Sequence, residues 1–424
     1  MIRRNRLIAA SLVAALVSAA FFVGYAYGQR SVPFAAAQPG QAAGSARTEG
    51  IRLLEALSNR VTSSFITKGI DERTLYLGAA KGMLESLGDP YTRFMEPRAF
   101  SEFKQDARGF FFGVGIFIDI RDRHLIVVQP IKGTPAARAG LRAGDWITKI
   151  DGLSTDGMAI QEAVVRIRGP RGTTVKLSIH RGTRDFEATI VRDRIEIVTG
   201  EGPDSLDAAS RAALRQAGIG YVKLITFNDA TARTFDRLFD EARRAGARAL
   251  ILDLRGNGGG LLDVSLEVAN RFVRSGQALV LTVNRDGRRT TERATSGPKI
   301  TMPVVVLVNE FTASASEIVS GALEDNGVAT LVGVKTFGKG VIQTIFDLPM
   351  DSGAAITTAK YLTPNGRDIH GRGLTPQVGV GETEEVLRER LRGKSDDEVD
   401  QALERMRAEQ LRRAIEVLKQ KMTR

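Results

Sequence analysis

Residues 303–317 read Pro-Val-Val-Val-Leu-Val-Asn-Glu-Phe-Thr-Ala-Ser-Ala-Ser-Glu, which predicts a buried strand, a tight turn and the start of a helix. The apolar run is short and continuous, as is typical of a parallel strand covered on both faces. Ser314 stands at the expected amino end of the helix, between Ala313 and Ala315. Helix-end N–H groups favour negative charge, which the oxyanion of an acyl-transfer reaction requires. Ser314 is therefore a candidate nucleophile, although the glutamate three residues later also permits a capping box that only stabilises the helix.

The pattern extends to both sides of this stretch, because apolar strands alternate with helices from residue 219 onward. Alternation of this kind is typical of an α/β fold, and continuous apolar runs indicate parallel strands. We therefore expect an α/β core of parallel-rich sheet and helices between residues 195 and 381. The expected segments are 220–224, 230–245, 249–254, 262–274, 278–283, 304–308, 314–325 and 329–332.

A serine nucleophile needs a base, and the composition leaves few candidates. The chain has no cysteine, which excludes a thiol nucleophile, a disulfide and a cysteine zinc site. Lys339 lies between two glycines after the last of these strands, and Gln343 follows on a further expected strand, where it would orient the amine. Burial would lower the lysine pKa toward the working range, as a base requires. Of the three histidines, His370 stays open as an alternative base.

A phosphate-binding loop is a rival interpretation of the same lysine. Gly333-x-x-x-x-Gly338-Lys339 matches most of a P-loop. The match fails because Gly340 replaces the serine or threonine that would hold magnesium, and because a strand is expected next where a P-loop has a helix. We therefore expect no nucleotide, metal or other cofactor.

A glycine-rich turn follows another buried strand. Residues 253–260 read Asp-Leu-Arg-Gly-Asn-Gly-Gly-Gly. The glycines would expose backbone N–H groups at the carboxyl end of the strand, where sites in α/β sheets form. Such groups would complete an oxyanion hole with the N–H of Ala315. The alternative is a turn that merely starts the next helix, and the glycine spacing does not fit a dinucleotide fingerprint.

A small β-rich unit precedes the α/β core at residues 110–194. Alternating apolar residues after Gly113-Val-Gly115 indicate a strand, and further strands and two short helices follow. The expected strands are 116–120, 124–129, 145–151, 173–180 and 185–191, and the expected helices are 134–140 and 158–167.

The amino terminus carries an export signal. Residues 7–28 contain no charge and follow Arg3, Arg4 and Arg6. The stretch is long enough to span a bilayer, and the arginines fit an amino end in the cytoplasm. The sequence leaves open whether residues 1–28 are a cleaved signal peptide or a membrane anchor. In both cases we expect an exported protein, periplasmic or anchored in the inner membrane with the remaining chain outside the cytoplasm.

The net charge of +11 does not indicate nucleic-acid binding. Residues 1–48 hold five arginines and no acid, and residues 382–424 are balanced, with eleven basic and eleven acidic residues. No basic block interleaved with aromatic residues appears. We expect a flexible linker at 29–48, a helical segment at 49–109 with a break at Gly69, and a charged helical tail at the carboxyl end. The leucines of that tail suggest self-association, and the alternative is a solvated surface helix.

Six segments together resemble the carboxyl-terminal processing peptidase family, whose members are tail-specific serine proteases with a PDZ domain. The segments follow family order between about residues 49 and 381 and are together highly specific. They are Leu84–Tyr91, Gly113–Ile116, Asp253–Gly260, Thr312–Glu317, Phe337–Gly340 with Gln343, and Tyr361–Gly366. The chain departs from the family at Pro376-Gln377, where members usually carry Pro-Asp, and no catalytic role attaches to that position.

The resemblance implies roles for individual residues. The nucleophile, the base and the supporting glutamine of the family fall on Ser314, Lys339 and Gln343. The nearby Ser316 and Lys335 are rejected for these roles. The oxyanion-hole glycine of the family falls on Gly259 or Gly260, and the sequence does not choose between them.

The resemblance also makes the β-rich unit a PDZ domain, which binds a free carboxyl terminus as an added strand. Residues 158–167 would line its groove. Arg168 resembles a basic position that links the PDZ domain to the active site in relatives, and a plain turn arginine is the alternative. The loop and strand edge that hold the substrate tail fall on Gly113, Val114, Gly115 and Ile116.

The sequence therefore predicts a serine endopeptidase that cleaves exported proteins near their carboxyl termini. Its substrates would be proteins with free, unstructured tails, and an adaptor protein and a second copy of the chain are expected partners. Membrane contact would run through residues 1–28 if they are not removed. The alternative from another class is a catalytically silent PDZ scaffold at the membrane.

Overall fold

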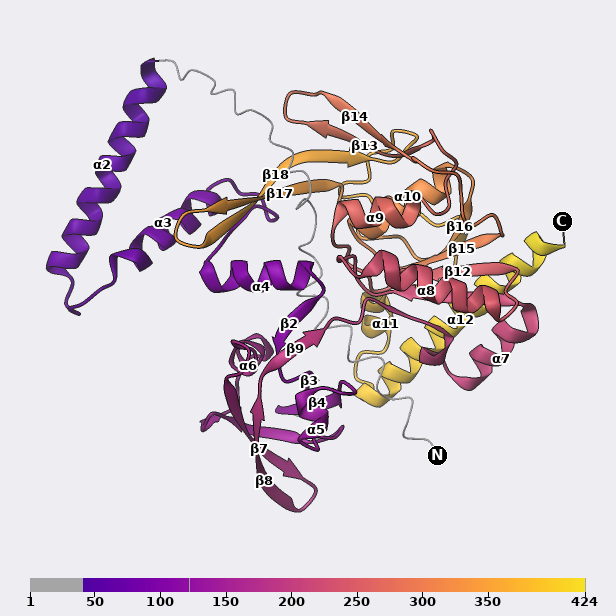
Figure 1. Cartoon of the computed structure of the whole chain (residues 1–424), viewed down its shortest axis with the longest axis horizontal. Coiled ribbons are helices and arrows are strands. Elements are labelled where there is room, and N and C mark those ends of the chain that lie inside the picture. Colours follow the sequence, from indigo (N-terminus) through magenta and orange to yellow (C-terminus); the bar gives the residue numbers. More distant parts are fainter. Residues whose placement is uncertain (1–40, 122, 424) are drawn as a thin grey trace. The chain divides into compact units, whose positions relative to one another are not determined.

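The computed structural model describes residues 41–121 and 123–423 (Figure 1). The described chain divides into two compact units. One unit holds residues 104–341 and 360–423, and the other holds residues 41–103 and 342–359. Each unit therefore combines chain segments that lie far apart in the sequence.

The hydrophobic segment expected at residues 7–28 lies outside the described residues. Within the described ranges, no helix is both long enough and apolar enough to cross a membrane. The cellular location therefore stays a prediction from the sequence.

A six-stranded sheet forms the centre of the first unit, in the order β10-β11-β12-β15-β16-β19. Neighbours from β11 to β19 pair in parallel, and the short β10 pairs antiparallel with β11. Every residue of β12 and β15 is buried, so the predicted parallel α/β core is confirmed. The strands are β10 (Gly200–Glu201), β11 (Ile219–Leu224), β12 (Ala249–Asp253), β15 (Val304–Val308), β16 (Ala329–Gly333) and β19 (Val378–Gly379).

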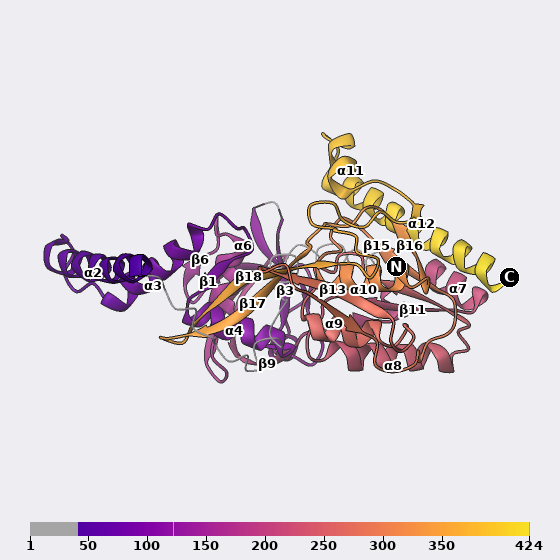
Figure 2. The same ribbon diagram turned by 90° about the horizontal axis from the view of Figure 1, so that it is seen from above.

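Helices cover both faces of this sheet, with α8 and α9 on one side and α12 on the other (Figure 2). The helix α8 packs on β11, α10 on β16, and α12 on β12, β15 and β16. The helices, together with one 3-10 turn, are η2 (Pro203–Ser205), α7 (Ala208–Ala217), α8 (Thr231–Arg244), α9 (Leu262–Ala269), α10 (Ala315–Asp325), α11 (Glu384–Arg390) and α12 (Asp396–Met422).

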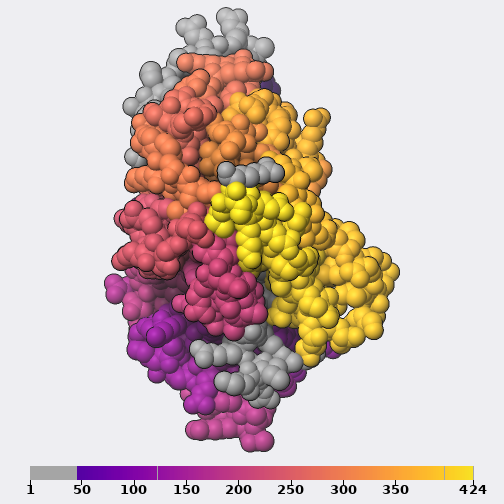
Figure 3. All heavy atoms as spheres, turned by 90° about the vertical axis from the view of Figure 1, so that its right-hand side faces the viewer, coloured from indigo at the N-terminus to yellow at the C-terminus, as the bar shows by residue number. Residues whose placement is uncertain are grey.

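The charged tail packs against the chain's own core. In Figure 3 the helix α12, in yellow, lies on the surface beside α7. Its apolar residues share a buried cluster with strands β11, β12 and β15 or pack against α11. These side chains are therefore unavailable for self-association, and that interpretation of the tail leucines is wrong. The buried residues are Leu403, Leu411, Ile415 and Leu418.

A buried ion pair ties this tail to β12. Arg255 donates from Nε and Nη2 to the carboxylate of Asp253, and from Nη1 to the carbonyl oxygen of Arg407 at 2.9 Å and to Gln410 at 3.0 Å. The hydroxyl of Tyr221 donates to Asp253 at 2.8 Å. Burial would raise the pKa of Asp253, but the Arg255 guanidinium holds it below its ordinary value.

The strand β13 (Ala278–Asn284) does not belong to the parallel sheet, although its apolar run led us to expect it there. It pairs antiparallel with β14 (Arg289–Arg293). The turn between them is held by the Asn284 side chain, which accepts hydrogen bonds from the N–H groups of Asp286 and Arg288. An apolar run reports burial and not the partner strand, so the prediction for this segment is wrong.

The second unit joins the amino-terminal segment to a later hairpin. The strand β1 (Arg93–Met95) pairs antiparallel with residues 353–355 of β18 (Ser352–Leu362), and β17 (Val341–Leu348) also pairs with β18. Helix α2 begins within the segment that we expected to be a linker, so residues 41–48 are helical. The helices are α2 (Gln41–Ser64), α3 (Glu72–Glu85) and α4 (Pro97–Ala107), whose last residues enter the first unit.

The predicted β-rich region is a five-stranded antiparallel path in the order β3-β4-β5-β7-β8, with one buried core. The strand β3 lies at the edge of the sheet, and helix α6 packs beside it. A two-stranded ribbon of β2 and β9 forms the entry and exit of the region. The elements are β2 (Phe110–Gly113), β3 (Ile116–Arg121), β4 (His124–Pro130), α5 (Pro135–Arg138), β5 (Trp146–Ile150), β6 (Leu153–Ser154), α6 (Ile160–Ile167), β7 (Thr174–Arg181), β8 (Arg184–Val191) and β9 (Asp193–Glu196).

Candidate active site

Three loops with polar residues meet at one edge of the parallel sheet. They follow β12, β15 and β16, which are neighbours in the sheet and run in the same direction. The carboxyl ends of such strands form the usual site of α/β proteins. The loops carry the glycine-rich turn, Ser314 and Lys339 respectively, so the fold brings together three motifs that are distant in the sequence.

Ser314 lies in a strained turn immediately before α10. Its φ of 56° and ψ of −119° are rare for a residue with a side chain. The residue is 1% exposed, and its Oγ has no hydrogen-bond partner among the described residues. The Glu317 N–H donates to the carbonyl oxygen of Ser314 at 2.8 Å and leaves the hydroxyl aside. The serine side chain therefore makes no cap hydrogen bond, whereas the other half of the capping box is present, because Ser314 N–H donates to Glu317 Oε2 at 2.9 Å.

The turn of Ser314 is tied to the glycine-rich loop by hydrogen bonds. The carbonyl oxygen of Asn257 accepts from Ala313 N–H at 3.1 Å and from Ser316 Oγ at 2.9 Å. The side chain of Asn309 accepts from Gly256 N–H at 2.9 Å. Ser316 is fully buried and its hydroxyl is engaged in this contact, whereas the Ser314 hydroxyl is not engaged.

The two candidate oxyanion glycines differ in their hydrogen bonds. A Cβ on Gly259 would lie 2.9 Å from the Cβ of Ser314, and φ there is 107°, so only glycine fits beside the candidate nucleophile. However, Gly259 N–H donates to the Asn257 side chain at 2.9 Å. The N–H groups of Gly260 and Ala315 have no acceptor among the described residues. The geometry therefore favours Gly260 over Gly259 as the second donor.

Lys339 is buried, at 2% exposed, whereas Lys335 is exposed. The backbone N–H of Lys339 donates to Glu317 Oε2 at 2.9 Å, and the same oxygen accepts from Ser314 N–H at 2.9 Å. The other oxygen, Oε1, accepts from Thr336 Oγ1 at 2.6 Å and from Gly338 N–H at 2.8 Å. Glu317 therefore holds the loops of the serine and the lysine together.

Burial raises the pKa of Glu317 above its ordinary value, and the hydrogen bonds from Thr336, Lys339, Gly338 and Ser314 oppose that rise. All four groups are donors, so both carboxylate oxygens of Glu317 act as acceptors. Sequence reasoning considered this glutamate only as a helix cap. The Ser-x-x-Glu spacing was visible, but the contact with the lysine loop depends on the fold.

Gln343 lies on β17, is 2% exposed, and donates from Nε2 to Thr357 Oγ1 at 3.2 Å. The strand that was expected after the lysine, and that argued against a P-loop, is present. His370 is exposed, and its Nδ1 accepts from Gly340 N–H at 3.3 Å. Among the described residues, no cluster of three or more His, Cys, Asp or Glu side chains could hold a metal.

The β-rich region carries a backbone loop that suits a terminal carboxylate. The carbonyl oxygens of Val114 and Gly115 accept hydrogen bonds from Ala136 and Ile131, while the N–H groups of the same two residues have no acceptor among the described residues. A Cβ on Gly115 would lie 2.4 Å from Thr134, so the loop requires glycine there. Ile116 then starts the edge strand β3.

Arg168 is the residue after α6 and is largely buried. Its Nη1 lies 3.5 Å from Asp106 Oδ1, and its guanidinium lies 4.4 Å from the centre of the Phe111 ring. A Cβ on Gly113 would lie 3.7 Å from its Cγ. Arg168 therefore contacts the end of α4 and the ribbon strand β2, and it is not a plain turn arginine.

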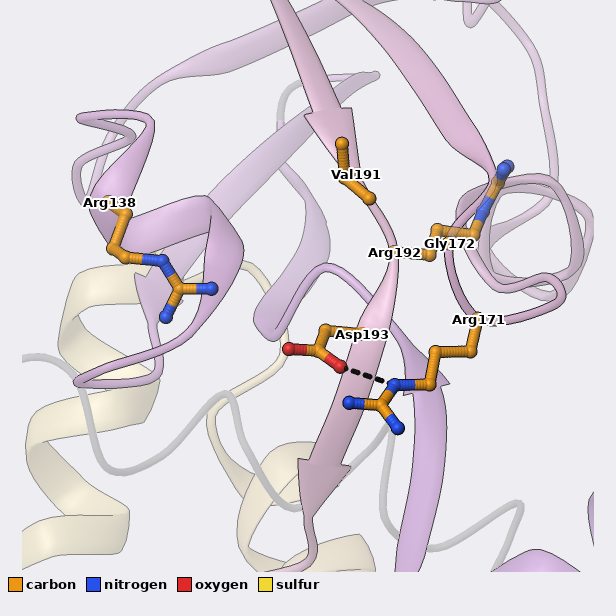
Figure 4. Close-up of a pocket in the computed structure, with 6 residues that line it drawn as sticks. All are labelled: Arg138, Arg171, Gly172, Val191, Arg192 and Asp193. Atoms are coloured by element: carbon orange, nitrogen blue, oxygen red, sulfur yellow. Dashed lines mark hydrogen bonds and ion pairs between the residues drawn. The ribbon is translucent and has the colours of Figure 1, made fainter.

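A cavity of about 280 Å³ lies at another place in the same region (Figure 4). Arg171 pairs there with Asp193 at 2.8 Å. Arg192 donates hydrogen bonds to the backbone carbonyl oxygens of Ile167 and Arg166. No lining residue belongs to the three loops of the parallel sheet. The full lining is Arg138, Arg171, Gly172, Val191, Arg192 and Asp193.

The chain is similar to curated proteases over most of its length. It is 35% identical over 340 residues to the carboxy-terminal processing protease CtpA of Bacillus subtilis (strain 168), covering 80% of this chain and 71% of that protein. It is 38% identical over 322 residues to the carboxyl-terminal-processing protease of Picosynechococcus sp. (strain ATCC 27264 / PCC 7002 / PR-6), covering 76% of each. The chain belongs to the carboxyl-terminal processing protease family.

Domain matches agree with this membership. Residues 218–380 match the peptidase family S41, residues 126–181 match the PDZ domain, and residues 15–99 match the activating protease CtpB N-terminal domain. Among solved structures, the photosystem II D1 C-terminal processing protease is 30% identical, with a TM-score of 0.48 over 87% of this chain and 92% of that chain. This carboxyl-terminal processing protease is a serine-type peptidase with a PDZ domain.

Proposed function

We propose that this protease cleaves exported proteins near their carboxyl termini with a Ser314–Lys339 dyad that Gln343 supports. The observation that carries the proposal is the Ser314 hydroxyl, which is buried, without a hydrogen-bond partner among the described residues, and held in a strained turn. A buried hydroxyl without a partner and a strained turn both lower stability, and such features cluster at functional sites. The buried Lys339 lies on the loop that shares Glu317 with this turn.

In the proposed reaction, neutral Lys339 takes the proton of Ser314 Oγ as this oxygen forms a bond to the peptide carbonyl carbon. The negative charge moves to the carbonyl oxygen, which accepts from the N–H groups of Ala315 and Gly260. The lysine ammonium then returns its proton to the leaving amine as the C–N bond breaks. A water molecule, deprotonated by the same lysine, attacks the acyl carbon, and the lysine ammonium returns that proton to Ser314 Oγ as the ester bond breaks. Burial of Lys339 supports this role because it disfavours the charged amine.

The PDZ domain would read the substrate tail. The substrate would add as a strand along the free edge of β3, with its carboxylate on the N–H groups of Val114 and Gly115. Partly exposed apolar side chains of β3 and α6 lie beside this edge and suit an apolar terminal residue. They are Ile116, Ile160 and Val164. Arg168 would transmit occupancy of this groove, because it contacts both the PDZ domain and Asp106.

The remaining partners follow from separate observations. Exposed apolar side chains on α2 support contact with a second copy of the chain: Ile51, Leu53 and Leu57. The export segment at residues 7–28 supports a periplasmic or membrane-anchored location, where a tail-reading protease would meet exported substrates. An adaptor protein is proposed on the resemblance alone.

A serine-directed fluorophosphonate probe tests the nucleophile directly. The purified wild-type protein should be labelled on Ser314, and the Ser314→Ala protein should not be labelled. In cells, exported proteins with uncleaved tails should accumulate when Ser314→Ala replaces the wild type. A wild-type protein that resists labelling would leave the silent PDZ scaffold as the better description.

A further inference from the structure

The hydroxyl of Tyr361 lies between the backbone of the nucleophile and that of the base. Tyr361 is near the end of β18 and is 1% exposed. Its Oη contacts the carbonyl oxygen of Ser314 at 3.1 Å and also the carbonyl oxygen of Lys339. One side chain thus touches the main chain of both members of the proposed dyad.

Glu317 makes the complementary contact to the same two residues. It accepts from the N–H groups of Ser314 and Lys339 at 2.9 Å each, and it is fully buried. Two side chains therefore contact the N–H and C=O groups of both Ser314 and Lys339, and the Ser314 carbonyl also accepts from the N–H groups of Glu317 and Ile318. One of these side chains accepts hydrogen bonds and the other donates them.

We infer that Tyr361 and Glu317 are positioning residues that set the separation of nucleophile and base. The inference rests on the proposed Ser314–Lys339 dyad. Proton transfer needs the two reacting atoms at hydrogen-bond distance, about 2.6–3.2 Å apart. A displacement of about 1 Å can lower a rate by roughly 100-fold. Neither Tyr361 nor Glu317 needs to touch the substrate for this effect.

The chemistry of both side chains fits the task. Two carbonyl oxygens converge on the phenol, so a donor is required there. Phenylalanine would remove the hydroxyl from both, and the Ser314 carbonyl would keep only the N–H groups of Glu317 and Ile318. Four donors converge on Glu317, so a glutamine would place its own N–H groups against some of them. A buried tyrosine also needs a partner for its hydroxyl merely to be stable, so a stability loss alone would not establish positioning.

Tyr221 provides a matched control for that stability effect. It is 2% exposed, and its hydroxyl donates to Asp253 at 2.8 Å without touching Ser314 or Lys339. Replacing either tyrosine by phenylalanine removes one buried hydroxyl and keeps the ring. Tyr221→Phe should therefore lower the melting temperature at least as much as Tyr361→Phe, because its hydroxyl donates to an ionised carboxylate.

The test compares kcat, KM and the pH dependence of fluorophosphonate labelling in the full-length protein. Tyr361→Phe should lose 10- to 100-fold in kcat, with a matching loss in labelling rate, a changed pH profile and an unchanged KM for a tailed substrate. Tyr221→Phe should keep the wild-type kcat and pH profile. A Tyr361→Phe enzyme whose kcat and pH profile equal those of Tyr221→Phe overturns the inference.

A donor-retaining variant covers the case in which Tyr361→Phe does not fold. Replacement of Tyr361 by 4-aminophenylalanine keeps two N–H donors at the same place and should retain at least a third of the wild-type kcat. A folded protein of this kind with the activity of Ser314→Ala would contradict the inference. Ser314→Ala in the same series distinguishes failure of the dyad from failure of the positioning role. An active Ser314→Ala enzyme would refute the dyad itself. An inactive Ser314→Ala enzyme beside a fully active Tyr361→Phe enzyme would refute only the positioning role.

Discussion

At Ser314 the backbone and the side chain have separate tasks. The N–H and the carbonyl oxygen are engaged by Glu317 and Tyr361, which hold a turn with φ of 56°. A non-glycine residue in such a conformation costs about 1–3 kcal/mol, which the surrounding contacts must offset. The hydroxyl takes no part in these contacts, so it is free to react without loosening the turn.

Ser314→Ala should abolish proteolysis and leave the fold intact. The hydroxyl makes no hydrogen bond among the described residues, so its removal should cost less than about 1 kcal/mol of the free energy of unfolding. Ser316→Ala is the matched control, because it breaks the bond to Asn257 and should cost about 1 kcal/mol while activity persists. Peptide cleavage and urea unfolding measure both quantities. An active Ser314→Ala beside an inactive Ser316→Ala would reverse the assignment.

Lys339→Ala should lose activity nearly as completely as Ser314→Ala, because nucleophile and base act as a unit. Lys339→Arg should also be inactive, since a guanidinium stays protonated and cannot accept the serine proton. Activity of the wild type should rise with pH as the amine loses its proton. Initial rates between pH 5 and 10 check this, and Lys335→Ala, at an exposed site, should be nearly normal.

His370 provides the control for the identity of the base. It is exposed and contacts Gly340 N–H. His370→Ala should therefore keep the wild-type pH profile. An inactive His370→Ala together with an active Lys339→Arg would show that the histidine is the base.

Among the elements, local sequence patterns located most strands and helices of the parallel core. The strand β13 was assigned to the wrong sheet because its partner β14 is not apolar and follows a turn that only the Asn284 contacts reveal. The strands β2 and β9 were missed for a similar reason, because the residues that pair in this ribbon are separated in the sequence by the whole PDZ domain. Pairing over long sequence distances is decided by the fold and leaves little trace in a local window.

The site shows the same division. Ser314, Lys339 and the glycine-rich turn lie in recognisable motifs at the ends of strands, so the sequence predicted them. The choice of Gly260 over Gly259 needed the hydrogen bond of Gly259 to Asn257. The contacts of Glu317 with the lysine loop and of Tyr361 with both loops join segments from different strands. No spacing in the sequence encodes them.

The turn after β15 also contacts the start of α11, through the partly buried carboxylate of Glu310. Glu310 accepts from Glu384 N–H, and its other oxygen is buried without a partner among the described residues. Burial raises the pKa of Glu310 above its ordinary value of 4.5, and the nearby Glu384 charge adds to the rise. The ionised side chain therefore opposes folding.

Glu310→Gln should stabilise the protein in a pH-dependent way. The folded-state pKa of Glu310 is raised, so its favourable contribution is complete below about pH 4.5 and is lost as pH rises through the folded value. Glutamine does not titrate and can keep the acceptor toward Glu384. The variant should match the wild type below about pH 4.5 and exceed its free energy of unfolding at pH 7. Urea unfolding at both pH values checks this, with the exposed Glu385→Gln as a control that changes neither value.

At the scale of the whole molecule, the PDZ domain is an insertion with closely spaced ends. Gly113 and Asp193 are register partners in the β2–β9 ribbon, so the chain leaves the domain where it entered. Arg168 adds a side-chain link from the PDZ domain to Asp106, outside it. In a domain attached in this way, binding of a substrate tail can affect the rest of the chain through a few contacts such as Arg168–Asp106. Mutation can test each of these contacts.

Amidating the terminal carboxylate of a peptide substrate should slow its cleavage by the intact enzyme about 10- to 100-fold. The N–H groups of Val114 and Gly115 have no acceptor among the described residues, and hydrogen bonds to a charged group contribute about 1.5–3 kcal/mol. Replacing residues 114–192 by a short linker between Gly113 and Asp193 should remove the discrimination, because both substrates would then be cut at one slow rate. Arg168→Ala should lower turnover of the free-tailed substrate more than Arg171→Ala, whose partner Asp193 is more exposed than Asp106. Equal cleavage of free and amidated tails by the wild type would show that the PDZ domain does not read the carboxylate, and equal effects of the two arginine changes would remove Arg168 from the link.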